Sequence, residues 1–403
     1  MDVLWEMQTP RAAYVHVPFC RRRCFYCDFP ISVVGDRLVG ESSGMMAEYV
    51  GWLIREIELE PAKGKGLSSI FFGGGTPSLL SPDQIRQILM TLERRFGFEL
   101  GIEISMEVDP GTFDLPRLES WRSAGVNRFS LGVQAFQDGL LEACGRSHRV
   151  ADVCRSVELL RSTGNWSLDL MSGLPGQTLW MWRESLELAI EAGSTHLSVY
   201  DLTIEPGTVF GKLSDRGNLN VPLEEEVVEM YRMTAERLSA VGFGRYEVSS
   251  YARSVEFECR HNRVYWSGLP FYGFGMGATS FVDGVRLGRA RTRAEYFDWV
   301  GEKEKNKTVQ DSRIAEKNSE AREREIFLER VMMGLRLVKG IDLGPLVHRF
   351  GTTLVDEAIV ALQPFVISGL VMVDEGWVRL SEPEGLLLSN VVLVGLFEAI
   401  DRE

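Results

Sequence analysis

The stretch that decides the fold is Tyr14-Val-His-Val-Pro-Phe-Cys-Arg-Arg-Arg-Cys-Phe-Tyr-Cys-Asp-Phe29, in which three cysteines follow a short apolar run. Cys20, Cys24 and Cys27 have the spacing CxxxCxxC, which lets three thiolates wrap one face of a cubane iron–sulfur cluster. A zinc site usually needs four ligands, often as two separated pairs, and no second pair follows in the sequence. The other alternative is that the three cysteines are ordinary thiols that bind no metal. The motif predicts a [4Fe–4S] cluster with one iron open to a small molecule.

The cysteines lie within a repeated alternation of strand and helix patterns. Short apolar runs predict buried parallel strands at 12–17, 68–72, 103–108, 128–133, 167–171 and 196–202. Helical patterns lie between them at 45–60, 82–96, 115–124, 150–162 and 179–192. This alternation implies a parallel sheet with right-handed crossovers. Six units instead of eight predict an α/β fold with an open, partial (β/α)6 barrel.

Polar and glycine-rich residues follow these predicted strands. Cys20 comes after the first strand, and Gly73-Gly-Gly-Thr-Pro77 comes after the second. Glu107, Gln134 and Asp169 lie at or near the ends of the third, fourth and fifth. Barrel-like folds form their ligand sites at the carboxyl ends of the strands. We therefore expect one site that combines the cysteines with these side chains.

The second half of the chain has a different pattern. We expect a barrel core with the cluster site at 1–215, a barrel extension at 216–301, a charged linker at 302–320 and a C-terminal domain at 321–403. The extension contains a helix at 224–241 and a strand at 246–251. In the last domain, helices at 326–338, 343–350, 354–368 and 383–400 surround a hairpin at 371–380. That order predicts a mostly helical, winged-helix-like domain.

Composition and charge limit the classes of partner. The 403 residues carry a net charge of −13, which argues against nucleic acid as the main partner. No apolar run approaches the roughly 18–20 residues that a membrane span needs. Met1–Thr9 lacks the pattern of a secretory signal, and the cysteine spacing is not that of a disulfide framework. We expect a reducing compartment, either cytoplasmic or organellar (mitochondrion or plastid), and not secretion.

Several longer motifs resemble one known family. The cysteine segment, Gly73–Pro77, Glu107-Val-Asp-Pro110, Asp169–Gln177 and Gly273–Ser280 are similar to the coproporphyrinogen III dehydrogenase-like family of radical S-adenosylmethionine (SAM) proteins. The resemblance extends from about residue 12 to the C-terminus. It implies a radical SAM barrel in which SAM occupies the open iron. Cleavage of its C–S bond by the reduced cluster then yields a 5′-deoxyadenosyl radical.

The resemblance also implies a set of SAM contacts. These residues are Tyr14, Tyr26, Gly74, Gly75, Thr76, Glu107, Gln134, Arg146 and Asp169. Their chemistry suits the role: glycines permit close backbone approach, carboxylates accept hydrogen bonds from hydroxyl or amino groups, and a guanidinium binds a carboxylate. A capping or loop role remains the alternative for the carboxylates.

Two features distinguish branches within the family. Oxygen-independent coproporphyrinogen III oxidases resemble this chain but carry a further cysteine where this chain has Phe29. The Cys-Asp-Phe form is similar to HemW-like proteins, regarded as heme chaperones. The segment 261–266 is similar to their HNxxYW motif, which implies heme contacts by His261, Asn262, Tyr265 and Trp266.

The resemblance thus favours a [4Fe–4S] protein that binds SAM, carries heme as cargo and delivers it to heme-accepting apo-proteins. The alternative is a coproporphyrinogen III oxidase that performs radical decarboxylation. A scaffold that has lost SAM chemistry is a third. The sequence leaves open the electron donor, the heme recipient and the oligomeric state.

Overall fold

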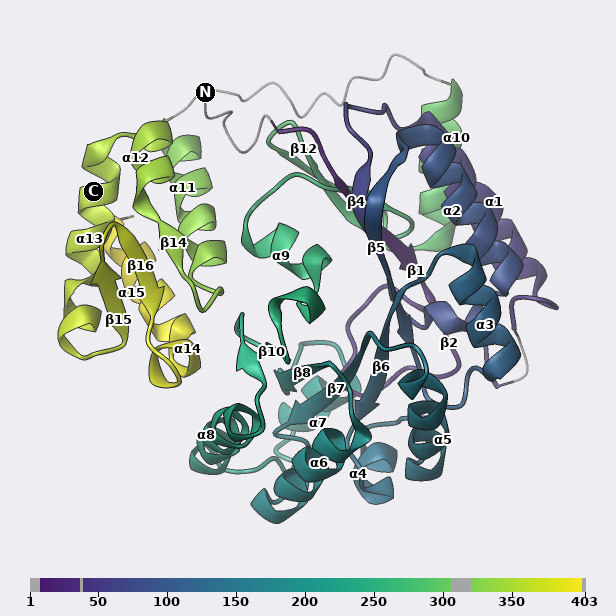
Figure 1. Ribbon diagram of the computed structural model, residues 1–403, viewed down its shortest axis with the longest axis horizontal. Helices are drawn as coiled ribbons and strands as arrows, with labels where there is room; N and C mark the ends of the chain where they lie inside the picture. Colours follow the sequence, from purple (N-terminus) through teal and green to yellow (C-terminus); the bar gives the residue numbers. More distant parts are fainter. Residues whose placement is uncertain (1–7, 37–38, 306–319, 401–403) are drawn as a thin grey trace.

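A curved nine-stranded sheet organises the computed structural model, which describes residues 8–36, 39–305 and 320–400 (Figure 1). Its strand order is β11-β1-β4-β5-β6-β7-β8-β10-β9. The six central strands are β1 (Ala12–Val17), β4 (Leu67–Gly74), β5 (Phe98–Val108), β6 (Arg128–Gln134), β7 (Trp166–Ser172) and β8 (His196–Asp201). All of them run parallel. The six predicted strands and the partial barrel are confirmed.

Helices cover the convex face of this sheet in Figure 1. They are α1 (Gly44–Leu59), α2 (Pro82–Phe96), α3 (Leu115–Ala124), α4 (Asp138–Ala143), α5 (Val150–Arg161), α6 (Leu179–Ala192) and α8 (Glu224–Ala240). Ser81 caps α2, since its side chain accepts from the Gln84 amide and the Gln84 side chain accepts from the Ser81 amide. Gly193 ends α6 in a left-handed conformation with φ 81°.

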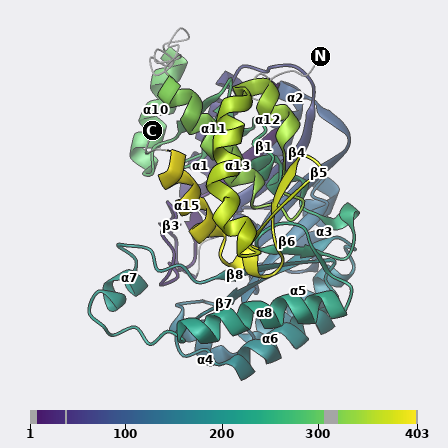
Figure 2. The ribbon, with the colours of Figure 1, turned by 90° about the vertical axis from the view of Figure 1, so that its left-hand side faces the viewer.

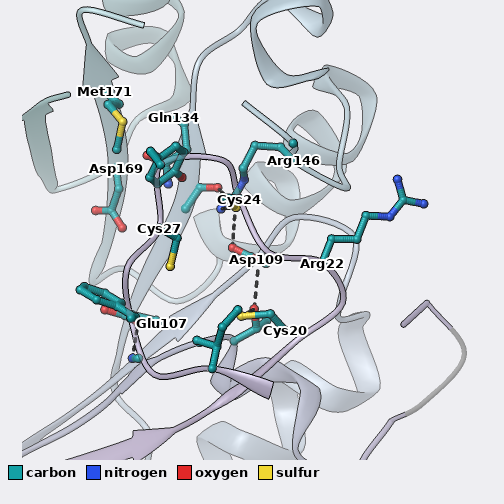
Figure 3. A pocket seen from close by; sticks show the side chains of 18 of the residues that line it. Cys20, Arg22, Cys24, Cys27, Glu107, Asp109, Gln134, Arg146, Asp169 and Met171 are labelled. Atoms are coloured by element: carbon teal, nitrogen blue, oxygen red, sulfur yellow. Dashed lines mark hydrogen bonds and ion pairs between the residues drawn. The ribbon is translucent and has the colours of Figure 1, made fainter. Parts of the chain in front are cut away.

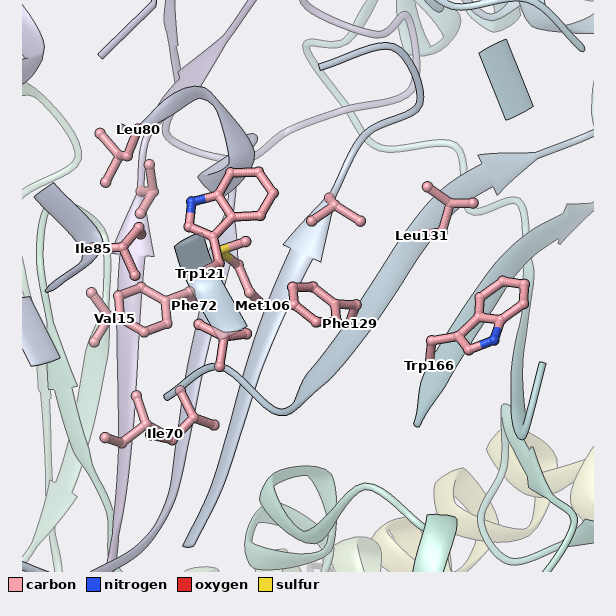
Figure 4. Packing of buried hydrophobic residues seen from close by; sticks show 14 of the residues in the cluster. Val15, Ile70, Phe72, Leu80, Ile85, Met106, Trp121, Phe129, Leu131 and Trp166 are labelled. Carbon is pink, nitrogen blue, oxygen red and sulfur yellow. The ribbon is translucent and has the colours of Figure 1, made fainter. Parts of the chain in front are cut away.

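Apolar and polar side chains alternate along each strand, so the sheet has one apolar face and one polar face. Figure 4 shows Val15, Phe72, Met106 and Phe129 packed together on the side that faces the helices, and all four are buried. Because successive side chains on a strand point to opposite faces, their neighbours point into the barrel. Burying one large apolar side chain contributes about 1.5–3 kcal/mol. The helix-facing core therefore holds the sheet, and the concave face is left for polar residues.

Short elements complete the barrel. They are β2 (Phe19–Cys20), β3 (Ser32–Val33), η2 (Pro77–Leu79), α7 (Val209–Ser214), β9 (Gly244–Arg245), β10 (Ser250–Ala252), η3 (Val255–Phe257), α9 (Arg260–Trp266), β11 (Tyr272–Phe274), β12 (Thr279–Val282), β13 (Val285–Gly288) and α10 (Arg293–Lys305). Strand β11 pairs in parallel with β1, and β10 pairs antiparallel with β8.

The predicted strand at 246–251 is wrong over residues 246–249. These residues link β9 to β10 and bond instead to the C-terminal domain. The amide of Val248 donates to the carbonyl of Arg336 at 2.8 Å, and the amide of Val338 donates to the carbonyl of Tyr246 at 3.1 Å. The backbone of residues 246–249 thus bonds to a distant segment of the chain and not to a strand of the barrel sheet.

The C-terminal domain has the predicted winged-helix-like order, but the first predicted helix ends at Gly334 instead of 338, and the one predicted at 383–400 is two helices. The domain comprises α11 (Glu320–Gly334), β14 (Ile341–Asp342), α12 (Leu343–Phe350), α13 (Thr352–Ile367), β15 (Val371–Asp374), β16 (Trp377–Leu380), α14 (Glu384–Leu387) and α15 (Ser389–Ile400). Its three strands pair in the order β14-β16-β15. Figures 1 and 2 show this domain on the concave side of the sheet, and Figure 1 shows α9 between the domain and the sheet. The domain therefore faces the open side of the barrel.

The predicted linker at 302–320 is wrong at its ends, because residues 302–305 finish α10 and Glu320 begins α11. Residues 306–319 lie outside the described part of the chain. The division at residue 215 stays a prediction. Among the described helices, none combines the length and apolar character needed to cross a membrane.

Candidate functional site

Cys20 ends β2, and Cys24 and Cys27 lie on the loop that joins β2 to β3, beyond the carboxyl end of β1. All three line one cavity of about 440 Å³, here called the main cavity (Figure 3). Arg23 holds the loop by donating to the carbonyls of Cys27 and Phe29 at 3.2 and 3.0 Å. One of the three consecutive arginines therefore has a structural role.

The residues fit a cluster better than a single ion. In the described ranges, no group of three His, Cys, Asp or Glu side chains is gathered closely enough to hold one metal ion. A cubane takes one thiolate per iron, so its thiols lie further apart around a common cavity. Gly75 leaves room beside Cys20, because a Cβ there would lie 3.0 Å from the Cys20 sulfur and 2.7 Å from the Phe19 carbonyl oxygen. Burial raises the pKa of Cys20 to about 12, and the positive charge of a bound cluster would offset this.

The predicted SAM residues converge on the same space. All except Tyr14 line the main cavity: Tyr26, Gly74, Gly75, Thr76, Glu107, Gln134, Arg146 and Asp169. Tyr14 lines two smaller neighbouring cavities. The inner chamber, of about 240 Å³, is lined by Tyr14, Phe29, Phe71, Gly74, Glu107, Arg128, Ser130, Asp169, Ser198, Tyr200, His261, Asn262 and Tyr265. The outer cavity, of about 360 Å³, is lined by Tyr14, His16, Asp28, Phe29, Pro30, Tyr265, Phe271, Gly277, Ala278, Thr279 and Arg291.

Arg146 forms the main ion pair of the site. Its guanidinium lies 2.7 Å from the Asp109 carboxylate and donates to the Gly132 carbonyl at 2.9 Å. It also lies 3.5 Å from the Cys24 sulfur. Asp109 in turn accepts a hydrogen bond from Thr76 at 3.2 Å. The sequence places Asp109 at a strand end without assigning it a role, and the structure makes it the link between the arginine and the glycine-rich turn.

Glu107 on β5 and Asp169 on β7 are half-buried carboxyl groups that line the main cavity on either side of β6. Burial, reinforced by the nearby Asp169, raises the pKa of Glu107 to about 8. Burial also raises the pKa of Asp169, although hydrogen bonds from serines oppose this shift. Glu107 accepts from the Gly74 amide at 3.1 Å, and Asp169 accepts from Ser130 at 3.0 Å. At neutral pH a protonated Glu107 can both donate and accept, as recognition of hydroxyl or amino groups requires.

Gln134 carries two signs of a missing ligand. Its φ of 70° is a left-handed conformation that costs a non-glycine residue about 1–3 kcal/mol. Its buried Oε1 accepts no hydrogen bond from the described residues. A buried amide oxygen without a donor is costly, so this atom fits contact with a bound polar group such as SAM.

The HNxxYW motif forms the short helix α9. His261 is fully buried, with Nδ1 3.1 Å from the Ser69 hydroxyl and Nε2 2.8 Å from the Tyr265 hydroxyl. Burial lowers the pKa of His261 to about 3, so the imidazole is neutral. Asn262 and Tyr265 line the inner chamber with His261, whereas Trp266 lines none of the three cavities. The motif thus adjoins the cofactor site, but its histidine nitrogens are already engaged.

Comparisons with known proteins agree with this geometry. The Radical SAM superfamily model matches residues 14–189, and the HemN C-terminal domain model matches residues 322–388. The heme chaperone HemW of Synechocystis sp. is 41% identical over 421 residues, which cover 98% of each chain. HemW of Bacillus subtilis is 35% identical over 387 residues, covering 95% of this chain and 98% of its own.

A solved structure shares the whole fold. Coproporphyrinogen III oxidase (HemN) from Escherichia coli superposes with a TM-score of 0.79 at 22% identity, covering 96% of this chain and 90% of its own. At that identity the likeness establishes the fold alone. The full-length similarity to the two chaperones is the finding that decides the family: this chain belongs to the HemW family of radical SAM proteins.

Proposed function

We propose that this protein is a heme chaperone of the radical SAM type, which binds heme as cargo and delivers it to apo-proteins. The observation that carries the proposal is full-length similarity, at 41% identity, to a protein named heme chaperone HemW. Cys20, Cys24 and Cys27 would hold the [4Fe–4S] cluster, with SAM beside it in the main cavity. Thiolate ligands of this kind require a reducing compartment. An electron donor and the heme recipients are the remaining expected partners.

Phe29 favours the chaperone over the oxidase. It occupies the place of the further cysteine that oxidases carry, and a phenyl ring can neither ligate metal nor donate a proton. Its side chain is 54% exposed and lines the main cavity, the inner chamber and the outer cavity. An exposed ring of this kind offers a flat apolar face to a porphyrin.

The HNxxYW residues are our candidates for heme contacts. A neutral imidazole can serve as an axial ligand to heme iron. His261 is neutral, but its Nε2 faces the Tyr265 hydroxyl at 2.8 Å. Ligation by His261 would therefore require Tyr265 to turn away, and the ring of Tyr265 could then contact the porphyrin. Asn262 and Trp266 would contribute polar and aromatic contacts from the same helix.

The residues of the main cavity would serve SAM. The reduced cluster with SAM supplies a 5′-deoxyadenosyl radical when both are bound. Gly74 and Gly75 leave backbone groups open to the aminocarboxylate, and Tyr26 would lie against the adenine. Glu107 and Asp169 would hydrogen-bond hydroxyl or amino groups, Gln134 would use its unpaired Oε1, and Arg146 would stabilise a carboxylate while it keeps Asp109 in place. Tyr14, with its hydroxyl 3.0 Å from His16 Nδ1, would support this wall from the inner chamber.

Two assays on one anaerobically reconstituted sample test the proposal. We expect heme uptake that survives desalting as a Soret band, and no loss of propionate carboxyls from coproporphyrinogen III with SAM and a reductant. Decarboxylation of that substrate, or the absence of heme uptake, would overturn the chaperone assignment.

Variants of α9 test the heme contacts separately. If His261 ligates the iron, His261→Ala removes the Soret band. Tyr265→Phe is the matched control, because it frees Nε2 and keeps the aromatic ring. It should retain the band or strengthen it. Equal heme binding by His261→Ala and wild type would exclude His261 as the ligand.

A further inference from the structure

The inner chamber lies deeper in the barrel than the main cavity and shares walls with it. Along β6, Arg128, Ser130, Gly132 and Gln134 alternate with the apolar residues that pack against the helices. Gln134 and Gly132 line the main cavity, Ser130 lines both spaces, and Arg128 lines the inner chamber. The strand thus leads from the cluster to Arg128 along one polar face.

Arg128 is a buried cation without a direct partner. The residue is 2% exposed, and its Nε–H finds no acceptor within hydrogen-bond distance among the described residues. Within that same part of the chain, no hydrogen bond or ion pair to its guanidinium is found. Arginine stays charged in proteins, and the nearby Glu103 and Asp169 favour its charged form, although neither carboxylate contacts the guanidinium directly. A guanidinium that borders a cavity under these conditions calls for an anionic ligand.

The nearby carboxyl groups are each engaged elsewhere. Asp169 accepts hydrogen bonds from Ser130 and Ser167 at 3.0 and 3.2 Å. Glu103 accepts from the backbone amides of Arg260 and His261 at 3.2 and 3.3 Å. Burial raises the pKa of Glu107 to about 8, so it is mostly protonated at neutral pH. Among the described residues, Arg128 therefore has counter-charges nearby but no direct contact, and its guanidinium is left open to a carboxylate of a ligand.

We propose that Arg128 anchors a carboxylate of a ligand that enters the inner chamber. The inference rests on the proposed function, because both ligands of that function carry carboxylates: heme has propionates, and SAM has its amino-acid carboxylate. The geometry favours heme. None of Cys20, Cys24 and Cys27 lines the inner chamber, so a SAM carboxylate at the open iron would lie in the main cavity.

The access route agrees with a porphyrin. Tyr14, Phe29 and Tyr265 line both the inner chamber and the outer cavity. A flat ligand against Phe29 at this boundary could therefore direct one propionate inward to Arg128. Arg94 on α2 is the matched arginine away from this route, because its side chain is 67% exposed and lines none of the three cavities.

The test compares each ligand with an analogue that lacks the carboxylate. Heme and heme dimethyl ester are titrated into wild type, Arg128→Gln, Arg128→Lys and Arg94→Gln. Charged hydrogen bonds of this kind correspond to about 10-fold or more in affinity. Wild type and Arg94→Gln should prefer heme over its ester by about that factor. Arg128→Gln should lose the preference, and Arg128→Lys should keep part of it.

A second arm identifies the source of the carboxylate. SAM and decarboxylated SAM are titrated into the same cluster-loaded variants. Loss of discrimination in Arg128→Gln for the SAM pair alone assigns the anchor to SAM; loss for the heme pair alone assigns it to heme. Unchanged discrimination in both arms, or an equal loss in Arg94→Gln, overturns the inference and leaves the proposed function intact. If Arg128→Gln does not fold, Arg128→Lys decides, since its preference must fall below that of wild type. Wild type that binds neither heme nor SAM removes both proposals.

Discussion

Arg146 lies 2.7 Å from the Asp109 carboxylate, and this pair ties the segment before α5 to the end of β5 beside the cysteine loop. Only 9% of the Arg146 side chain and 26% of the Asp109 side chain are exposed. The same guanidinium reaches the Cys24 sulfur at 3.5 Å. A partly buried ion pair in the cavity wall therefore stabilises the loop that carries Cys24 and Cys27 (Figure 3).

Removing this ion pair should lower both the stability of the fold and the retention of the cluster. Arg146→Gln leaves Asp109 without its cation, and we expect the free energy of unfolding to fall by about 1–3 kcal/mol. Cluster retention during desalting should fall as well. The control is Arg155→Gln, whose side chain is 70% exposed and pairs with Asp152 within the same helix. That change should cost about 0–1 kcal/mol. Equal effects of the two substitutions, measured by urea unfolding, would contradict the role given to Arg146.

The pKa of Glu107 gives a prediction for pH. Its value in the folded protein is about 8, compared with 4.5 for an ordinary glutamate. Between these values the folded state binds a proton that the unfolded state has released, so this group's contribution to stability falls as pH rises. Glu107→Gln removes that dependence. The measurement is the free energy of unfolding of cluster-free protein. As pH increases from about 5 to 8, wild type should lose stability relative to Glu107→Gln.

The matched control for this experiment is Glu119→Gln, since Glu119 is an exposed residue on α3. We expect no comparable pH-dependent difference there. A constant difference between Glu107→Gln and wild type across the same range would mean that Glu107 is ionised in the folded protein.

A second buried ion pair stabilises the barrel far from the cluster. Arg289 lies 2.8 Å from Glu56, and both side chains are 0% exposed. Glu56 also accepts from the Gly275 amide and the Tyr296 hydroxyl, both at 2.7 Å. Arg289→Met leaves the buried Glu56 carboxylate without its cation. We expect the free energy of unfolding, measured with urea, to fall by about 3–5 kcal/mol.

The comparison for this pair is Arg86→Ala, which breaks an exposed i,i+3 pair with Asp83 on α2. That loss should not exceed about 1 kcal/mol. A loss for Arg289→Met as small as this would show that Glu56 is satisfied by its other donors.

Cysteine substitutions test the ligand set. Replacing Cys20, Cys24 or Cys27 singly by Ala should reduce iron and sulfide content after anaerobic reconstitution close to zero. Cys154→Ala is the control, because Cys154 is exposed on α5 and lines none of the three cavities. A full cluster in any of the three variants would remove that cysteine from the ligand set.

The central strands were predictable because buried parallel strands read as continuous apolar runs. Strand β11 was not, since Tyr272–Phe274 has three residues within a glycine-rich segment. Its place beside β1 depends on a pairing between residues more than 250 positions apart. The prediction for 246–249 failed for a similar reason, because this segment bonds to a turn after α11, in another domain.

The mouth of the barrel was predictable and its interior was not. Strand ends locate the cysteines, Glu107 and Asp169, because polar residues after apolar runs are visible in the sequence. Arg128 begins its strand and lies away from the expected site, although the alternation Arg128, Ser130, Gly132, Gln134 was a signal for it. The contacts of His261 with Ser69 and Tyr265 could not be read locally, because Ser69 is 192 residues away.

The central claim is heme delivery, and transfer to an apo-protein measures it most directly. Protein loaded with heme and freed of excess is mixed with an apo heme enzyme, and recovered activity is followed with and without an added heme scavenger such as apomyoglobin. We predict recovery that is faster than from free heme at equal concentration and that persists with the scavenger. Recovery no faster than from free heme, or abolished by the scavenger, would contradict the account.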